Sequence, residues 1–89
     1  MKAKDHSFSP EDRVVTVVQQ VFVKRSIERS VCADDILAEV GLTSLDTVKI
    51  VLLVESEFDL MIPISDITPA NFRSISTISR LVSRLLNDA

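Results

Sequence analysis

Residues that interrupt secondary structure are scarce in this chain, which has one glycine and three prolines among 89 residues. Long segments between few breaking residues are typical of a helical domain. The length corresponds to one small domain with a modest core. Its single cysteine, Cys32, excludes an internal disulfide, and its one histidine, His6, leaves no cluster with metal-ligand spacing. The core must therefore be built from aliphatic side chains, which the 46% hydrophobic content supplies.

The first helix is predicted to run from Pro10 to about Ser26. Ser9 is placed to cap it, proline suits the first helical position, and the helix dipole favours the acidic residues Glu11 and Asp12 in the first turn. The β-branched composition of the segment favours a strand, but the start signals and the length of the run favour a helix. The apolar residues at helical spacing are Val14, Val17, Val18, Val21 and Phe22.

A long loop is predicted for residues 27–43, where apolar residues are scattered. Within it, the segment ADDILAEVG is expected to form a short helical turn that ends at the only glycine, Gly41. The second long helix is predicted to begin at Thr43 or Ser44 and to run to about Phe58. Thr43 and Asp46 stand at the spacing of a capping box.

Two prolines interrupt the chain after this helix. Thr68 before Pro69 repeats the pattern of a cap followed by proline, so the segment TPANF is predicted to be one short helix. The last helix is predicted to begin near Ser74 or Ser76. Its apolar face comprises Ile75, Ile78, Leu81, Val82, Leu85 and Leu86, with Arg80 and Arg84 off that face. The predicted fold is all-α, with three longer helices, one short helix and a long first loop.

The second long helix has two apolar stripes. One falls within a narrow sector of the helical wheel and is predicted to face the core: Thr47, Ile50, Val51, Val54 and Phe58. The other comprises Leu45, Val48 and Leu52 and is centred about a third of a turn or more away. Either the bundle buries this second stripe beneath the first helix, or Leu45 and Leu52 stay partly exposed as a docking surface.

Ser44 stands where the second stripe begins, and its hydroxyl has two interpretations. A serine at a helix start is most often an N-terminal cap. Thr43 can already fill that role, however. A hydroxyl at this place is also well positioned to hold a phosphodiester, because the free backbone N–H groups and the helix dipole favour an anion there.

The segment TSLDTVKIVLLVESEFDLMIP resembles the signature region of acyl carrier proteins. The resemblance is strong over residues 41–63 and looser over the rest of 10–87. The positions that match in order and spacing are Ser44, Leu45, Asp46, Thr47, Val48, Glu55, Glu57, Phe58, Ile62 and Pro63.

This resemblance implies a small four-helix carrier domain over residues 9–87, after a flexible tail at residues 1–8. Ser44 would carry 4′-phosphopantetheine, which a phosphopantetheinyl transferase installs from coenzyme A. The thiol of this arm would hold an acyl or aminoacyl thioester in fatty acid or secondary-metabolite biosynthesis. A loading ligase and downstream transferases are the other expected partners. The residues that would form the docking surface for partners are Thr43, Leu45, Val48, Lys49, Leu52 and Glu55.

The chain departs from the family pattern at three places. Thr43 replaces the family's aspartate, so a standard transferase is expected to act less well. Lys49 and Ser56 replace acidic residues of fatty-acid carriers, which dilutes the acidic recognition surface. The segment SDITPANFRSISTISRLV is more similar to free-standing carriers that accept aminoacyl groups.

Several function classes are excluded or disfavoured. A net charge of −3 lacks the basic excess of a nucleic-acid surface. No apolar run approaches the roughly 18 residues that would span a bilayer, and no secretory signal is evident, so a cytoplasmic location is expected. The protein is also expected to be a monomer. The chain holds no acid–base pair and no activated nucleophile, so no enzymatic activity is expected; His6 and Cys32 are interpreted as solvated tail and loop residues. The alternative function is a helical interaction module with the carrier fold that never receives the arm.

Overall fold

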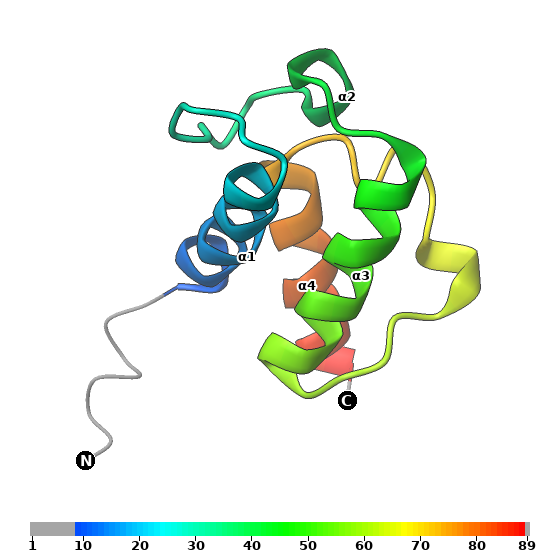
Figure 1. Ribbon diagram of the computed structural model, residues 1–89. Coiled ribbons are helices and arrows are strands. Elements are labelled where there is room, and N and C mark those ends of the chain that lie inside the picture. Colours follow the sequence, from blue (N-terminus) through cyan, green and yellow to red (C-terminus); the bar gives the residue numbers. More distant parts are fainter. Residues whose placement is uncertain (1–8, 89) are drawn as a thin grey trace.

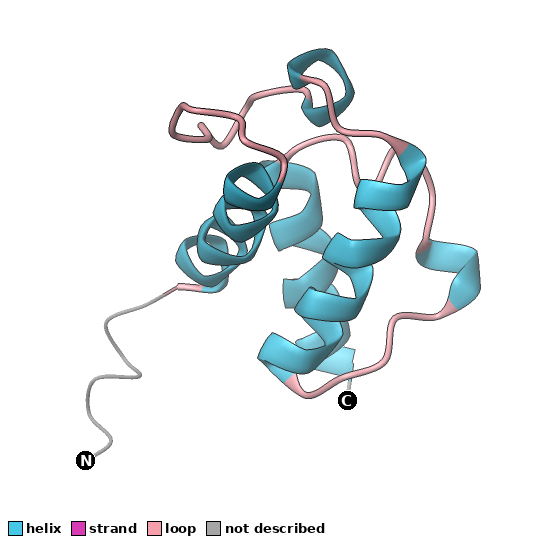
Figure 2. Ribbon diagram, viewed as in Figure 1, coloured by secondary structure: helices cyan, strands magenta, loops and turns pink. Residues whose placement is uncertain are grey.

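Helices and loops make up the part of the chain that the computed structural model describes, residues 9–88, and no strand occurs in it (Figure 2). The all-α prediction is therefore confirmed. No helix in this range is long and apolar enough to cross a membrane. The helices are α1 (Pro10–Lys24), α2 (Leu37–Val40), α3 (Ser44–Phe58), the short 3₁₀ helix η2 (Ile64–Asp66) and α4 (Ile75–Asp88).

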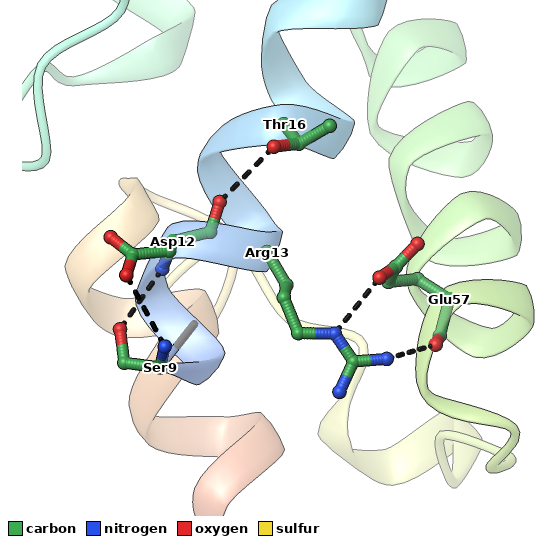
Figure 3. Close-up of polar contacts among 5 residues, drawn as sticks. All are labelled: Ser9, Asp12, Arg13, Thr16 and Glu57. Carbon is green, nitrogen blue, oxygen red and sulfur yellow. Dashed lines mark hydrogen bonds and ion pairs between the residues drawn. The ribbon is translucent and has the colours of Figure 1, made fainter. Parts of the chain in front are cut away.

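Helix α1 begins at the predicted cap. The Ser9 hydroxyl accepts a hydrogen bond from the Asp12 backbone N–H at 3.2 Å, and the Asp12 carboxylate accepts one from the Ser9 N–H at 3.2 Å (Figure 3). This reciprocal pair is a capping box and satisfies two donors that the first turn would otherwise leave free. The helix ends close to its predicted end, and Ser26 just beyond it has a positive φ of 58°.

The core lies between the three long helices, because α1 packs against both α3 and α4 (Figure 1). The residues predicted to be buried on α1 and in the first stripe of α3 are buried, apart from the half-buried Thr47. The long loop closes one end of the bundle with α2, which ends at Gly41 as predicted. The fully buried hydrophobic side chains, which anchor the packing, are Val14, Val18, Phe22, Ile50, Val54, Ile75, Ile78 and Val82.

The prediction of a helix at TPANF is wrong. The Thr68 hydroxyl accepts a hydrogen bond from the Asn71 N–H at 3.1 Å, and the Thr68 carbonyl accepts one from the Phe72 N–H at 3.1 Å. This single turn does not propagate, because the Arg73 carbonyl accepts a hydrogen bond from the N–H of Leu37 at 2.9 Å instead of continuing a helix. The short helix on this side of the molecule is η2, which precedes the segment.

Arg13 joins the first turn of α1 to the last turn of α3 (Figure 3). Its Nε donates to the Glu57 carboxylate at 2.9 Å, and a terminal nitrogen donates to the Glu57 backbone carbonyl at 2.6 Å. The guanidinium also lies 4.3 Å from the centre of the Phe58 ring. One side chain therefore neutralises a carboxylate, caps a free carbonyl at a helix C-terminus and covers a core aromatic ring.

Arg13→Ala is expected to lower the free energy of unfolding by about 1–2 kcal/mol, which combines a half-exposed ion pair, one hydrogen bond and a cation–π contact. Urea melts would measure the change. Arg80→Ala is the matched control, because Arg80 is exposed on α4 and forms no ion pair within residues 9–88. Equal losses for the two variants would contradict the role given to Arg13.

Candidate functional site

Thr43, not Ser44, caps helix α3. Thr43 has an extended backbone, and its hydroxyl accepts a hydrogen bond from the Asp46 N–H at 3.4 Å. The Asp46 carboxylate accepts one in return from the Thr43 N–H at 2.8 Å. This capping box confirms the spacing argument made from sequence. Ser44 is the first helical residue, so its hydroxyl is not needed to start the helix.

The side chain of Ser44 is exposed to solvent. Within residues 9–88 its hydroxyl has no hydrogen-bond partner. The Thr47 N–H donates to the Thr43 carbonyl at 3.0 Å, and the N–H groups of Ser44 and Leu45 lie before this bond in the first turn. Such amides favour a negatively charged group. The site therefore offers a free hydroxyl beside donors that suit the oxygens of a phosphodiester.

An open hollow of about 770 Å³ lies beside Ser44. Helices α2 and α3 line one side, and the segment after η2 lines the other with Ile67, Phe72 and Arg73 among its residues. A bulky group attached to the Ser44 hydroxyl therefore has both room and apolar surface next to it. The residues present fit a long, flexible arm joined through a phosphate.

Asp46 ties this helix start to α1. The residue is only 2% exposed, and its carboxylate forms an ion pair with Arg25, which follows the last residue of α1. Burial alone raises the pKa of Asp46. The hydrogen bonds from the Thr43 N–H and hydroxyl, together with the charges of Arg25 and Lys49, outweigh burial, so the pKa lies below its ordinary value of 3.8. The cap of α3 is therefore fixed by a charged, buried group.

Arg25 is a residue of this site that was not predicted from the sequence. Arg25 and Asp46 are 21 residues apart, and no local pattern joins them. The only signal for such a residue was Asp46 itself, in the segment SLD. A carboxylate that is buried needs a cation or hydrogen-bond donors beside it, so a buried Asp46 implies a partner of this kind.

The stability of the fold is expected to fall in acid partly through Asp46. The folded chain holds this carboxylate deprotonated to a lower pH than the unfolded chain does. Its contribution is fully present above the unfolded pKa near 3.8 and is lost as the pH falls through the lower folded pKa. Asp46→Asn is expected to cost about 1–3 kcal/mol at neutral pH, because charged hydrogen bonds are lost.

Urea melts of the wild type and Asp46→Asn at a series of pH values from about 7 to about 3 would test this linkage. The stability difference between the two proteins is expected to shrink toward the acid end. A difference that stays constant with pH would show that the Asp46 charge does not stabilise the fold.

The second stripe of α3 is exposed. Leu45 is 74% exposed, Val48 54% and Leu52 60%, so the interpretation that the first helix buries them is wrong. Lys49 is exposed on the same helix. Glu55, by contrast, is used within the fold: its carboxylate accepts a hydrogen bond from the Ile62 N–H at 2.8 Å and so holds the turn after α3.

The docking role of the six residues named from sequence stays a prediction. The structure brings Leu45, Val48, Lys49 and Leu52 together on the exposed side of α3. The hydroxyl of Thr43 is used by the cap, and the carboxylate of Glu55 by the following turn.

The other candidate residues are Cys32 and His6. Cys32 is a free, exposed loop thiol. His6 lies outside the described residues. No group of three or more histidine, cysteine, aspartate and glutamate side chains within residues 9–88 is arranged to hold a metal ion. Sequence reasoning also missed two strongly exposed apolar side chains, Met61 at 84% and Ile64 at 87%, in the segment that follows α3.

The chain is similar to a known protein family and to two aminoacyl carrier proteins. The family described as "Phosphopantetheine attachment site" matches residues 12–85. Aminoacyl carrier protein 1 of Bradyrhizobium diazoefficiens is 40% identical over 78 residues, which are 88% of this chain and 87% of that protein. Aminoacyl carrier protein 2 of the same organism is 39% identical over 72 residues, 81% of each chain.

Solved structures show the same fold. One matched chain comes from a crystal structure of Bradyrhizobium japonicum glycine:carrier protein ligase complexed with its cognate carrier protein and an analogue of glycyl adenylate. It has a TM-score of 0.76 and 37% identity, covering 84% of this chain and 96% of the other. A second, from the ligase complexed with glycylated carrier protein, has a TM-score of 0.65 and 38% identity, covering 78% and 96%.

Proposed function

Because this chain belongs to the phosphopantetheine attachment-site family, we propose that it carries aminoacyl groups as thioesters on a 4′-phosphopantetheine arm attached to Ser44. The cofactor of the family is this covalent arm, and its terminal thiol holds the cargo. The observation that carries the choice of residue is the division of roles at the start of α3. Thr43 caps the helix, which leaves the exposed Ser44 hydroxyl free for attachment.

The choice of aminoacyl cargo is supported by the relatives. Both Bradyrhizobium carriers named above are aminoacyl carriers, and each covers at least 81% of this chain. Both matched crystal structures contain a glycine:carrier protein ligase. An amino-acid ligase that loads the thiol of the arm is therefore the partner that these similarities favour over a fatty-acid enzyme.

The remaining partners follow from the chemistry of the arm. A phosphopantetheinyl transferase forms the phosphodiester with the Ser44 oxygen, and downstream transferases take the cargo from the thioester. The chain itself catalyses none of these steps. It acts as a monomer in the cytoplasm, where coenzyme A supplies the arm and Cys32 stays reduced.

Incubation of the purified chain with coenzyme A and a broad-specificity transferase tests the proposal. Intact-mass spectrometry is expected to show one added phosphopantetheinyl group per chain. Because Thr43 replaces the family's aspartate, conversion is expected to be slower than for a carrier that has the aspartate. A chain that stays unmodified, while a control carrier is converted in the same mixture, would favour the interaction module without an arm.

A further inference from the structure

A second hollow, of about 330 Å³, lies between α1 and α3. Helix α1 lines it with Val21, Lys24 and the adjoining Arg25, and α3 lines it with Lys49, Leu52 and Leu53. Three of these six side chains are apolar and three are cationic. We name these six residues the basic hollow. Its volume suits one or two side chains of a partner and is too small for a folded segment.

The positive charge of the basic hollow is only partly neutralised among residues 9–88, because the Asp46 carboxylate pairs with Arg25 and lies within the field of Lys49. No acidic residue lines the hollow. Arg25 pairs with the buried Asp46, but 38% of its side chain remains exposed. Lys24 and Lys49 form no ion pair with any of residues 9–88. Two unpaired lysines beside a partly exposed, paired arginine give this surface a positive charge, whereas the net charge of the chain is −3.

We infer that the basic hollow binds an acidic surface of the amino-acid ligase that loads the arm, an inference that rests on the proposed function. An apolar ligase side chain fills the space between Val21 and Leu52, and ligase carboxylates face Lys24 and Lys49. Opposite charges on the two surfaces steer the encounter and fix its orientation. The docking surface therefore includes the end of α1, in addition to the α3 residues named from sequence.

The place of the hollow favours a ligase over a transferase as its occupant. Lys49 and Leu53 lie five and nine residues beyond Ser44, which is about 8–14 Å along the helix axis. Only Arg25 of the hollow reaches the first turn of α3, where it pairs with the buried Asp46. A transferase acts on the Ser44 oxygen itself and must cover the start of α3. A ligase acts on the thiol at the far end of the arm, so it can dock beside the serine and leave it uncovered.

Charge reversal on α1 gives the sharpest test, because Lys24 lies off the helix that carries Ser44. Lys24→Glu, Lys49→Glu and the control Arg80→Glu change the net charge equally, and Arg80 is exposed on α4, away from the hollow. Lys24→Gln, which removes the charge without reversing it, is the milder variant. Each chain is first given its arm with coenzyme A and the transferase. Intact mass confirms the arm, and thermal melts confirm the fold.

Loading is then measured with ATP, glycine and the Bradyrhizobium japonicum glycine:carrier protein ligase as the probe, at low and high salt. The kcat/KM for loading is expected to fall roughly tenfold for Lys24→Glu and Lys49→Glu at low salt, and less for Lys24→Gln. Arg80→Glu is expected to load like the wild type. The deficit is expected to shrink at high salt, because ions screen surface charges. Rates of arm attachment are expected to stay equal for Lys24→Glu and Arg80→Glu.

Two results would overturn the inference itself. Lys24→Glu could load as fast as Arg80→Glu, which would remove α1 from the docking surface. Lys24→Glu could lose arm attachment as strongly as loading, which would make the transferase the occupant. An arm-bearing wild type that takes up no glycine would contradict the proposed loading partner, on which the inference rests. A wild type that never gains the arm would instead contradict the proposed function.

Discussion

Phe58→Ala and Val54→Ala are each expected to lower the free energy of unfolding by about 2–5 kcal/mol. Val54 is fully buried and Phe58 nearly so, and both belong to the stripe of α3 that contributes to the hydrophobic core. Phe58 also lies beneath the guanidinium of Arg13, so its loss removes a cation–π contact. The total stability of a domain of this size is about 5–10 kcal/mol, so either change can leave much of the protein unfolded.

Leu52→Ala is the matched control on the same helix. Leu52 is 60% exposed, so its truncation is expected to change stability by about half a kcal/mol or less. Urea melts of the three variants would measure the difference. Among the molecules that stay folded, Leu52→Ala is expected to be loaded more slowly than Val54→Ala or Phe58→Ala. An apolar side chain at the centre of an interface can contribute more than about 1 kcal/mol to binding. A Leu52→Ala protein as unstable as Val54→Ala would make the second stripe part of the core.

Ser44→Ala is expected to abolish attachment of the arm without unfolding the protein. The Ser44 hydroxyl has no hydrogen-bond partner within residues 9–88, and the capping box of Thr43 and Asp46 remains intact in the variant. The free energy of unfolding is therefore expected to change by about half a kcal/mol or less. Thr43→Ala provides the contrast, because loss of a cap costs about 1 kcal/mol.

Intact mass after incubation with coenzyme A and the transferase separates these two variants. Thr43→Ala is expected to gain the arm and Ser44→Ala is not. Arm attachment to the Ser44→Ala protein would place the modified residue elsewhere in the chain.

The parts of the fold that the sequence predicted depend on contacts between near neighbours. The Ser9 and Thr43 caps each act on a residue three positions away, and the two stripes of α3 follow from helical spacing alone. The candidate serine was found in the same way, from its place after a capping residue and from a resemblance that is strongest over residues 41–63. Exposure of the second stripe stayed open, because spacing does not tell which of two apolar faces a bundle covers.

The parts that the sequence did not predict depend on contacts between distant segments. The partner of Asp46 is Arg25, 21 residues away, and the partner of Glu57 is Arg13, 44 residues away. Neither pair has a local signature, since each depends on how α1 crosses α3. The basic hollow is missed for the same reason, because Lys24 and Lys49 come from different helices. At Thr68 the local cap was correct, but a bond from Leu37 to the Arg73 carbonyl decided the outcome.

The most direct test of the account is the chemical state of Ser44 in protein isolated from the cells that make it. Proteolysis and tandem mass spectrometry of the peptide that contains TSLD would locate any added group. We expect phosphopantetheine on Ser44 in these chains, with a fraction of the arms bearing an amino acid that hydroxylamine releases while the arm stays attached. An unmodified Ser44 in every copy would contradict the carrier function.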